Sequence, residues 1–174
     1  LRFKSLATGE LLADAVPNVE EGMAWATDNQ RVIYVEKDPV TLLGLRVRLH
    51  VLGTDPATDA LLYEEPDESF YTAVELTKDR RYLLIHSSST VTSEVRYARA
   101  DDADLRFNVL LPRERGHEYS VEHVDGRWIV RTNWQARNFR IMETPVDAPP
   151  DRGHWREIVA HRDDVFISGF DVFK

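Results

Sequence analysis

Hydrophobic and polar positions along the chain predict a series of short β-strands separated by tight turns. Runs rich in β-branched and aromatic residues alternate with clusters of Gly, Pro, Asn and Asp. Three such runs begin at Arg31, Arg81 and Arg127, and each directly follows a turn-forming sequence. These sequences are Asp28-Asn29, Lys78-Asp79-Arg80 and Asp125-Gly126, and Asp-Asn and Asp-Gly suit the positive φ angles of hairpins. A further strand-like run precedes each turn, at residues 23–27, 70–77 and 119–124.

The same pattern repeats along the chain. The strands that follow the turns start 50 and 46 residues apart. Two more strands are expected in each period, the third at residues 45–51, 93–98 and 139–146 and the fourth at residues 60–64, 107–111 and 155–160. Four antiparallel strands per period of this length are typical of a β-propeller blade. We therefore predict an all-β, partial β-propeller with three full blades, at residues 17–64, 65–111 and 112–161. A β-sandwich with a similar number of strands is the alternative.

Both ends of the chain are expected to be parts of further blades. Residues 1–16 are predicted to supply two outer strands of a preceding blade, joined by a turn at Thr8-Gly9. Residues 162–174 would supply the first strand of the next blade, with the strand itself at 166–173. Such part-blades expose strand edges and apolar faces. We expect self-association: the 166–173 strand pairs with the strands of residues 1–16, either within one chain as a small closed ring or between two chains.

Composition narrows the classes of partner and chemistry. The chain has 174 residues, 43% of them hydrophobic, and a net charge of −8. An acidic surface repels phosphate backbones and anionic lipids, so neither nucleic acid nor a membrane is an expected partner. The absence of Cys excludes disulfides, thiol nucleophiles and Cys-ligated zinc, and no cofactor is expected. The first residues contain no apolar signal segment, so a cytoplasmic location is expected, and the start at Leu1 suggests a segment of a longer polypeptide.

An ordered set of short motifs resembles a known family. These motifs are Leu6-Ala-Thr-Gly-Glu, Trp25-Ala-Thr-Asp-Asn, Leu52-Gly-Thr-Asp-Pro-Ala-Thr-Asp, Leu62-Tyr-Glu-Glu, Arg80-Arg-Tyr, Thr92-Ser-Glu-Val-Arg, Glu118-Tyr-Ser-Val-Glu-His, Arg131-Thr-Asn, Asn138-Phe-Arg and His161-Arg-Asp-Asp-Val. Together they resemble the N-terminal propeller of the prolyl oligopeptidase family, most of all its oligopeptidase B branch (protease II). The resemblance implies a seven-bladed propeller that caps an α/β-hydrolase domain, and serine peptidase chemistry on short peptides, after Lys or Arg in this branch. It also implies that the catalytic triad and the carboxylates that bind the basic side chain lie outside this segment.

The residues themselves offer no convincing catalytic centre. Ser168 has Phe166 and Phe170 where a Gly-x-Ser-x-Gly elbow needs glycines. His86 beside Ser87-Ser88-Ser89 could in principle form a catalytic base and nucleophile. We expect these residues instead to form a polar loop between the second and third strands of a blade. His117 and His123 could share a metal ion, although we expect one in an exposed loop and the other at the end of a strand. The pairs Glu64-Glu65 and Asp101-Asp102 are expected to be solvated surface and not glycosidase acids.

Charge suggests a role for one loop. In a propeller, the loops from fourth to first strand and those from second to third strand lie on the same face. These loops together carry −5 of the net charge of −8. The most acidic is the loop with Glu64, Glu65, Asp67 and Glu68, which is our candidate for steering short basic peptides towards the protein. Ordinary charge for solubility is the alternative explanation.

Two functional hypotheses follow. In the first, the segment is the gating and size-excluding part of a serine oligopeptidase, works together with a hydrolase domain outside this chain, and has no activity by itself. In the second, it belongs to a freestanding propeller that binds a protein or peptide and catalyses nothing. A Gly-x-Ser-x-Gly sequence followed by Asp and His downstream in the parent gene would favour the first.

Overall fold

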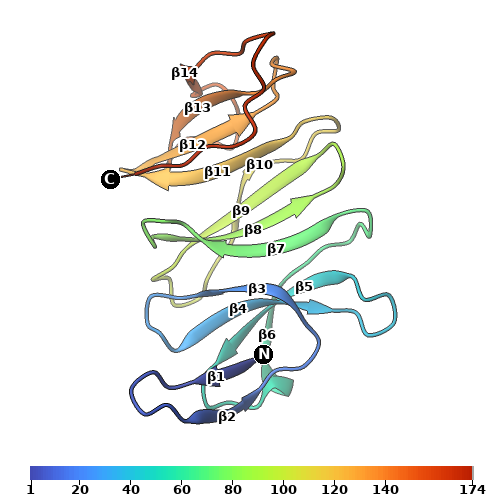
Figure 1. Ribbon diagram of the computed structural model, residues 1–174, viewed down its shortest axis with the longest axis vertical. Coiled ribbons are helices and arrows are strands. Elements are labelled where there is room, and N and C mark those ends of the chain that lie inside the picture. Colours follow the sequence, from blue (N-terminus) through green and yellow to red (C-terminus); the bar gives the residue numbers. More distant parts are fainter. Residues whose placement is uncertain (174) are drawn as a thin grey trace.

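The computed structural model describes residues 1–173 and shows a stack of antiparallel sheets (Figure 1). An N-terminal hairpin pairs β1 (Arg2–Lys4) with β2 (Leu11–Ala15). Three four-stranded blades follow in chain order. The first blade contains β3 (Val19–Trp25), β4 (Arg31–Lys37), β5 (Gly44–Val51) and β6 (Ala60–Glu64), with a short 3₁₀ turn at Pro56–Thr58. The second contains β7 (Tyr71–Leu76), β8 (Tyr82–Ser88), β9 (Ser93–Arg99) and β10 (Asn108–Leu111). The third contains β11 (Tyr119–Val124), β12 (Arg127–Thr132), β13 (Arg140–Pro145) and β14 (Arg156–Val159).

This arrangement confirms the predicted all-β blade architecture. Each blade pairs its strands in simple sequence order, as the repeated turn–strand pattern predicts. The turns between first and second strands hold Asn29 at φ 55°, Arg80 at φ 61° and Asp125 at φ 49°. Asn and Asp tolerate this left-handed conformation, but Arg80 does so less readily. It is held there by Asp79, whose carboxylate accepts bonds from the Thr77 hydroxyl and the Arg81 amide.

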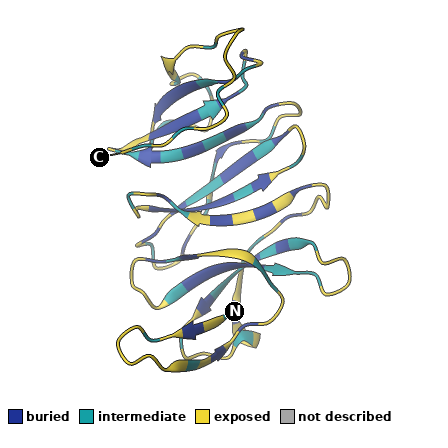
Figure 2. Cartoon of the chain, viewed as in Figure 1, coloured by how far each residue is buried: buried dark blue, intermediate teal, exposed yellow. Residues whose placement is uncertain are grey.

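The hydrophobic core consists of layers between successive sheets. One cluster lies between the hairpin and the first blade and includes Phe3, Val32 and Tyr34. A second joins the first and second blades, and a third joins the second and third blades around Trp128. Figure 2 shows β8 buried along most of its length, because neighbouring blades cover both of its faces. In contrast, β7 alternates between exposed and buried residues.

The first strand of the first blade differs from the expected range. The sequence predicts the first strand at residues 23–27, but β3 already begins at Val19. The pairing of β3 with β4 shifts between Val19 and Met23. Gly22, at φ 100°, lies in this irregular stretch, where a side chain would be strained. A β-bulge therefore extends the strand beyond the run that the apolar pattern marks.

The end of the chain does not form the expected strand. Residues 166–173 belong to no sheet of the described part, and Lys174 lies outside the described residues. The segment instead crosses the open face of the third blade, where Arg131 Nε donates to the Ile167 carbonyl at 2.6 Å and the Ile167 amide donates to the Asn138 carbonyl at 3.0 Å. The N-terminal hairpin lies at the opposite end of the stack (Figure 1). The expected closure of one chain into a small ring is therefore wrong, because three intervening blades separate the two segments.

No helix within residues 1–173 is both long enough and apolar enough to cross a membrane.

Candidate functional site

Three loops from the first and second blades gather on one face. The β6–β7 and β10–β11 loops meet the β8–β9 loop around a cavity of about 320 Å³. Six of its eight lining residues are polar or charged, and the lining consists of Asp67, Ser69, Phe70, Ser89, Val91, Thr92, Arg113 and Arg115. The acidic loop was predicted from the sequence to lie on this face.

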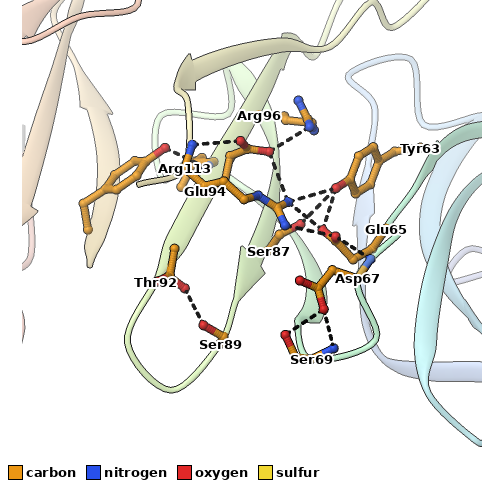
Figure 3. A network of polar contacts seen from close by, with 12 residues as sticks. Tyr63, Glu65, Asp67, Ser69, Ser87, Ser89, Thr92, Glu94, Arg96 and Arg113 are labelled. Carbon is orange, nitrogen blue, oxygen red and sulfur yellow. Dashed lines mark hydrogen bonds and ion pairs between the residues drawn. The ribbon is translucent and has the colours of Figure 1, made fainter. Parts of the chain in front are cut away.

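Glu65 is the best-anchored residue of that loop. Its side chain is fully buried and forms a two-pronged ion pair with Arg113, at 2.8 and 3.1 Å (Figure 3). The Tyr63 hydroxyl donates to it at 2.6 Å and the Asp67 amide at 3.1 Å. Burial by itself would raise the pKa of Glu65, but the hydrogen bonds to its charged form outweigh burial and lower the pKa to about 2. Glu65 is therefore an ionised structural group.

Arg113 connects Glu65 to the second blade. Its backbone amide donates to Glu94 Oε2 at 3.0 Å, and its guanidinium also lies 3.3 Å from Glu94 Oε1 (Figure 3). The guanidinium stacks over the Phe70 ring at 4.1 Å. The hydrogen bonds that Arg113 donates to Glu65, and secondly to Glu94, raise the pKa of Arg113 above its ordinary value. Two carboxylates of different blades thus share one cation.

The other acidic residues of the loop are exposed, but two of them have partners. Glu64 accepts a bond from Arg46 Nε at 3.0 Å. Asp67 accepts bonds from the Ser69 amide and hydroxyl, at 2.9 and 2.7 Å, and these bonds lower the pKa of Asp67. Glu68 is exposed. The expectation of a fully solvated Glu64-Glu65 pair is wrong for Glu65, because its charge is neutralised by an arginine that sequence spacing does not reveal.

The apparent His86–Ser87 pair is not a catalytic couple. Both residues lie in β8, where successive side chains point to opposite faces. His86 Nε2 contacts Glu75 at 2.7 Å, and the Ser87 hydroxyl faces Tyr63 at 3.4 Å. Ser87 and Ser88 are strand residues and not part of the expected loop. Ser168 lies in the irregular segment after the third blade, and within residues 1–173 no serine occupies a strand-to-helix elbow.

His117 and His123 occupy separate buried places. His123 Nδ1 contacts Asp79 at 2.5 Å across the second and third blades. His117 contacts the Thr132 hydroxyl at 2.7 Å and stacks on Tyr119. The expected exposed loop position is therefore wrong for His117, which is only 4% exposed. Among the described residues, no three His, Asp or Glu side chains converge to hold a metal ion.

The state of His117 leads to a prediction about acid stability. Burial, with the nearby charge of Arg152, lowers the pKa of His117 from 6.5 to about 4. The unfolded chain takes up this proton first, so the neutral histidine stabilises the fold fully above pH 6.5 and loses that contribution as the pH falls towards 4. We expect His117→Gln to flatten the decline in unfolding free energy between pH 6.5 and 4. Urea unfolding at several pH values measures this, and an unchanged slope would contradict it.

A second buried cluster, not predicted from the sequence, surrounds His50. His50 is 0% exposed and contacts Asp59 at 2.9 Å and Asp14 at 3.0 Å through its two ring nitrogens. Tyr34 donates to Asp59 at 2.9 Å. The bond from the Gly53 amide is the main cause that lowers the pKa of Asp14. These groups join the hairpin to the first blade. Their positions are far apart in the sequence, so no local motif marks them.

Comparisons with known proteins agree with the stacked blades. The family described as "Prolyl oligopeptidase, N-terminal beta-propeller domain" matches residues 1–174. Dipeptidyl aminopeptidase BI of Pseudoxanthomonas mexicana is 48% identical over 99% of this chain and 24% of its own length. Protease 2 of Moraxella lacunata is 31% identical over 83% of this chain and 21% of its own. The structure of oligopeptidase B from Leishmania major superimposes with a TM-score of 0.88 at 29% identity, covering 95% of this chain and 23% of that one.

These matches define the class of fold: the three blades are part of a propeller of the kind found at the N-terminus of prolyl oligopeptidases. The chain belongs to the prolyl oligopeptidase family of N-terminal β-propeller domains. It spans about a quarter of the length of the relatives it matches.

Proposed function

We propose that the chain is part of the propeller that covers the active site of a serine peptidase and restricts it to short peptides. The observation that carries this proposal is the match of the whole chain to the family's propeller domain, together with three stacked blades. A ring of such blades leaves a narrow axial channel. A short flexible peptide can pass through it, whereas a folded protein is too wide unless the domains move apart.

For specificity, we propose cleavage after Lys or Arg. The acidic charge of the chain and the relatives named protease 2 and oligopeptidase B support this choice. A second candidate is the release of dipeptides, because the relative with 48% identity is a dipeptidyl aminopeptidase. Peptides with a free or an acetylated N-terminus, each with one internal arginine, separate the two. Release of the same fragment from both supports cleavage after basic residues, whereas cleavage of the free peptide only, two residues from its start, supports dipeptide release.

The 174-residue chain by itself is expected to have no peptidase activity. We propose that the nucleophile and its base lie in a hydrolase domain beyond these residues. The 174-residue chain should neither cleave an arginyl chromogenic peptide nor react with a serine-directed fluorophosphonate, whereas the complete protein should do both. Specific labelling of a serine within the chain would contradict the assignment. A complete protein with neither property would favour a freestanding binding propeller.

We propose that the exposed carboxylates of the acidic loop attract basic peptides to the complete protein. Glu65 is buried beneath the loop and paired with Arg113, whereas Glu64, Asp67 and Glu68 are exposed and can attract a basic peptide from solution. In the complete protein, replacing these three by amides should lower kcat/KM for arginyl peptides by about two- to fivefold at low salt and leave it unchanged at high salt, because exposed charges are screened. The matched control replaces Asp101, Asp102 and Asp104. An equal loss in both variants, or a loss independent of salt, would contradict steering by this loop.

A further inference from the structure

A second cavity, on a different part of the stack, has the lining of a site for a cation. It measures about 300 Å³ and lies between the second and third blades. Tyr97 of β9 and the strand β10 supply one wall, and Trp128 of β12 and the β13–β14 loop supply the other. Because β10 and β14 are the last strands of their blades, the cavity lies towards the edge of the stack, away from β7 and β11.

Three aromatic side chains line this cavity. The Tyr97 and Trp128 rings meet edge to face with their centroids 5.0 Å apart. Trp155, near the end of the β13–β14 loop, is the third, and it also packs edge to face against Trp134 at 6.2 Å. Trp128 is almost fully buried, whereas Tyr97 and Trp155 keep part of their surface exposed. Faces of Trp and Tyr attract cations, and a group of them can replace part of the water around a cation.

The charge in the lining of this cavity is negative. Among residues 1–173, Asp151 is the one charged residue that lines the cavity. Its contacts with the Gly153 amide at 2.7 Å and His154 at 3.8 Å both involve Oδ1, and its side chain is 59% exposed. The neighbouring Arg152 binds Glu114 at 2.8 Å and His117 at 3.0 Å, so its charge is engaged outside the cavity. A ligand therefore meets aromatic faces and a carboxylate with no competing cation in the lining.

A buried hydroxyl offers a further acceptor. Thr144 lines the cavity and is directly opposite Trp128 in the β12–β13 pair, so the two side chains share a face of the sheet. The Thr144 Oγ1 atom is buried and has no hydrogen-bond partner within residues 1–173. Such atoms usually find a partner in folded proteins. A planar group with several N–H donors suits this combination of aromatic walls, a carboxylate and an unused hydroxyl.

We propose that this cavity binds the guanidinium of an arginine side chain presented by a peptide or protein partner. The aliphatic stem of arginine would pack against the apolar walls, and its planar head would stack on the rings and pair with Asp151. The net charge of −8 favours the approach of such a partner. The proposal concerns binding only and does not depend on peptidase activity.

The test uses the complete protein labelled with 5-fluorotryptophan. The ¹⁹F resonance that is missing from the Trp155→Phe variant belongs to Trp155, whose ring lines this cavity. We expect acetyl-arginine amide to shift it saturably and to bind about tenfold more tightly than acetyl-citrulline amide, its neutral analogue, because the cation interacts with several rings. Nα-acetyl-lysine amide, whose side chain keeps its charge, should bind more weakly because it lacks the planar head. The free guanidinium ion should also bind more weakly because it lacks the aliphatic stem.

Two variants of the same loop complete the test. Asp151→Asn should raise the Kd for acetyl-arginine amide by about two- to fivefold at low salt, as expected for one exposed ion pair. Asp147→Asn is the matched control, because Asp147 is exposed in the same loop but does not line the cavity. Equal binding of the citrulline analogue, no saturable shift, or identical effects of the two variants would overturn the proposal. Tighter binding of the lysine probe or of free guanidinium would overturn the assignment to an arginine side chain.

Discussion

Replacing Arg113 by Ala should destabilise the stack by about 3–5 kcal/mol, the usual cost of leaving a buried charge without its partner. The Glu65 side chain is fully buried and depends on Arg113 for both of its charged hydrogen bonds. Glu94 would lose the same cation, although Arg96 still reaches it at 2.7 Å. Urea unfolding followed by tryptophan fluorescence measures the loss.

The matched control for this experiment is Arg115→Ala. Arg115 is exposed on the same loop, so its removal should change the unfolding free energy by less than about 0.5 kcal/mol. The double variant Glu65→Gln/Arg113→Gln should recover much of the loss, because it buries two neutral amides in place of one unpaired carboxylate. Equal losses of unfolding free energy in Arg113→Ala and Arg115→Ala would show that the buried ion pair does not stabilise the packing of these blades.

Replacing His50 by Leu is expected to have a comparable effect at the other end of the stack. The His50 imidazole lies between Asp14 of the hairpin and Asp59 of the first blade and contacts both carboxylates. Both carboxylates are almost completely buried from solvent. Without it, two buried carboxyl groups face each other with no donor between them. We expect a loss of about 3–5 kcal/mol and early detachment of the hairpin.

Hydrogen exchange can locate this second effect. Amides of β1 and β2 should exchange faster in His50→Leu, whereas those of β11 and β12 should keep their protection. His154→Leu is the control, because the His154 side chain is 54% exposed and lies 3.8 Å from Asp151, outside the contact between the hairpin and the first blade. Protection of the hairpin that is unchanged in His50→Leu would contradict the role given to this histidine.

The blade architecture could be predicted from the sequence because its signals are local. A turn such as Asp125-Gly126 and the apolar run after it lie within ten residues, and the period then repeats. The bulge at Gly22 was missed, since a bulge changes pairing without changing the apolar pattern. The 166–173 run was predicted to be a strand because its composition is right for one. A strand also needs a neighbouring strand, and no part of the described chain supplies it there.

The site residues were harder to predict because they meet across blades. Glu65 could be singled out as an acidic loop residue, but its partner Arg113 is 48 residues away. Asp14 and His50 are 36 residues apart and belong to different sheets. Nothing in either local sequence distinguishes a buried ion pair from a solvated charge, so the sequence suggested solvent exposure for Glu65. Only the packing of one blade on the next determines these pairs.

The central claim, a propeller that admits only short peptides to a peptidase, has a direct test in the complete protein. One arginine-containing sequence is offered as a free decapeptide and as an exposed loop of a stable folded host, at equal concentrations. A third sample presents it in the same host unfolded and cut into short fragments. The account predicts rapid cleavage of the decapeptide and the fragments and no cleavage of the folded host. Cleavage of the folded host at the rate of the decapeptide would contradict it.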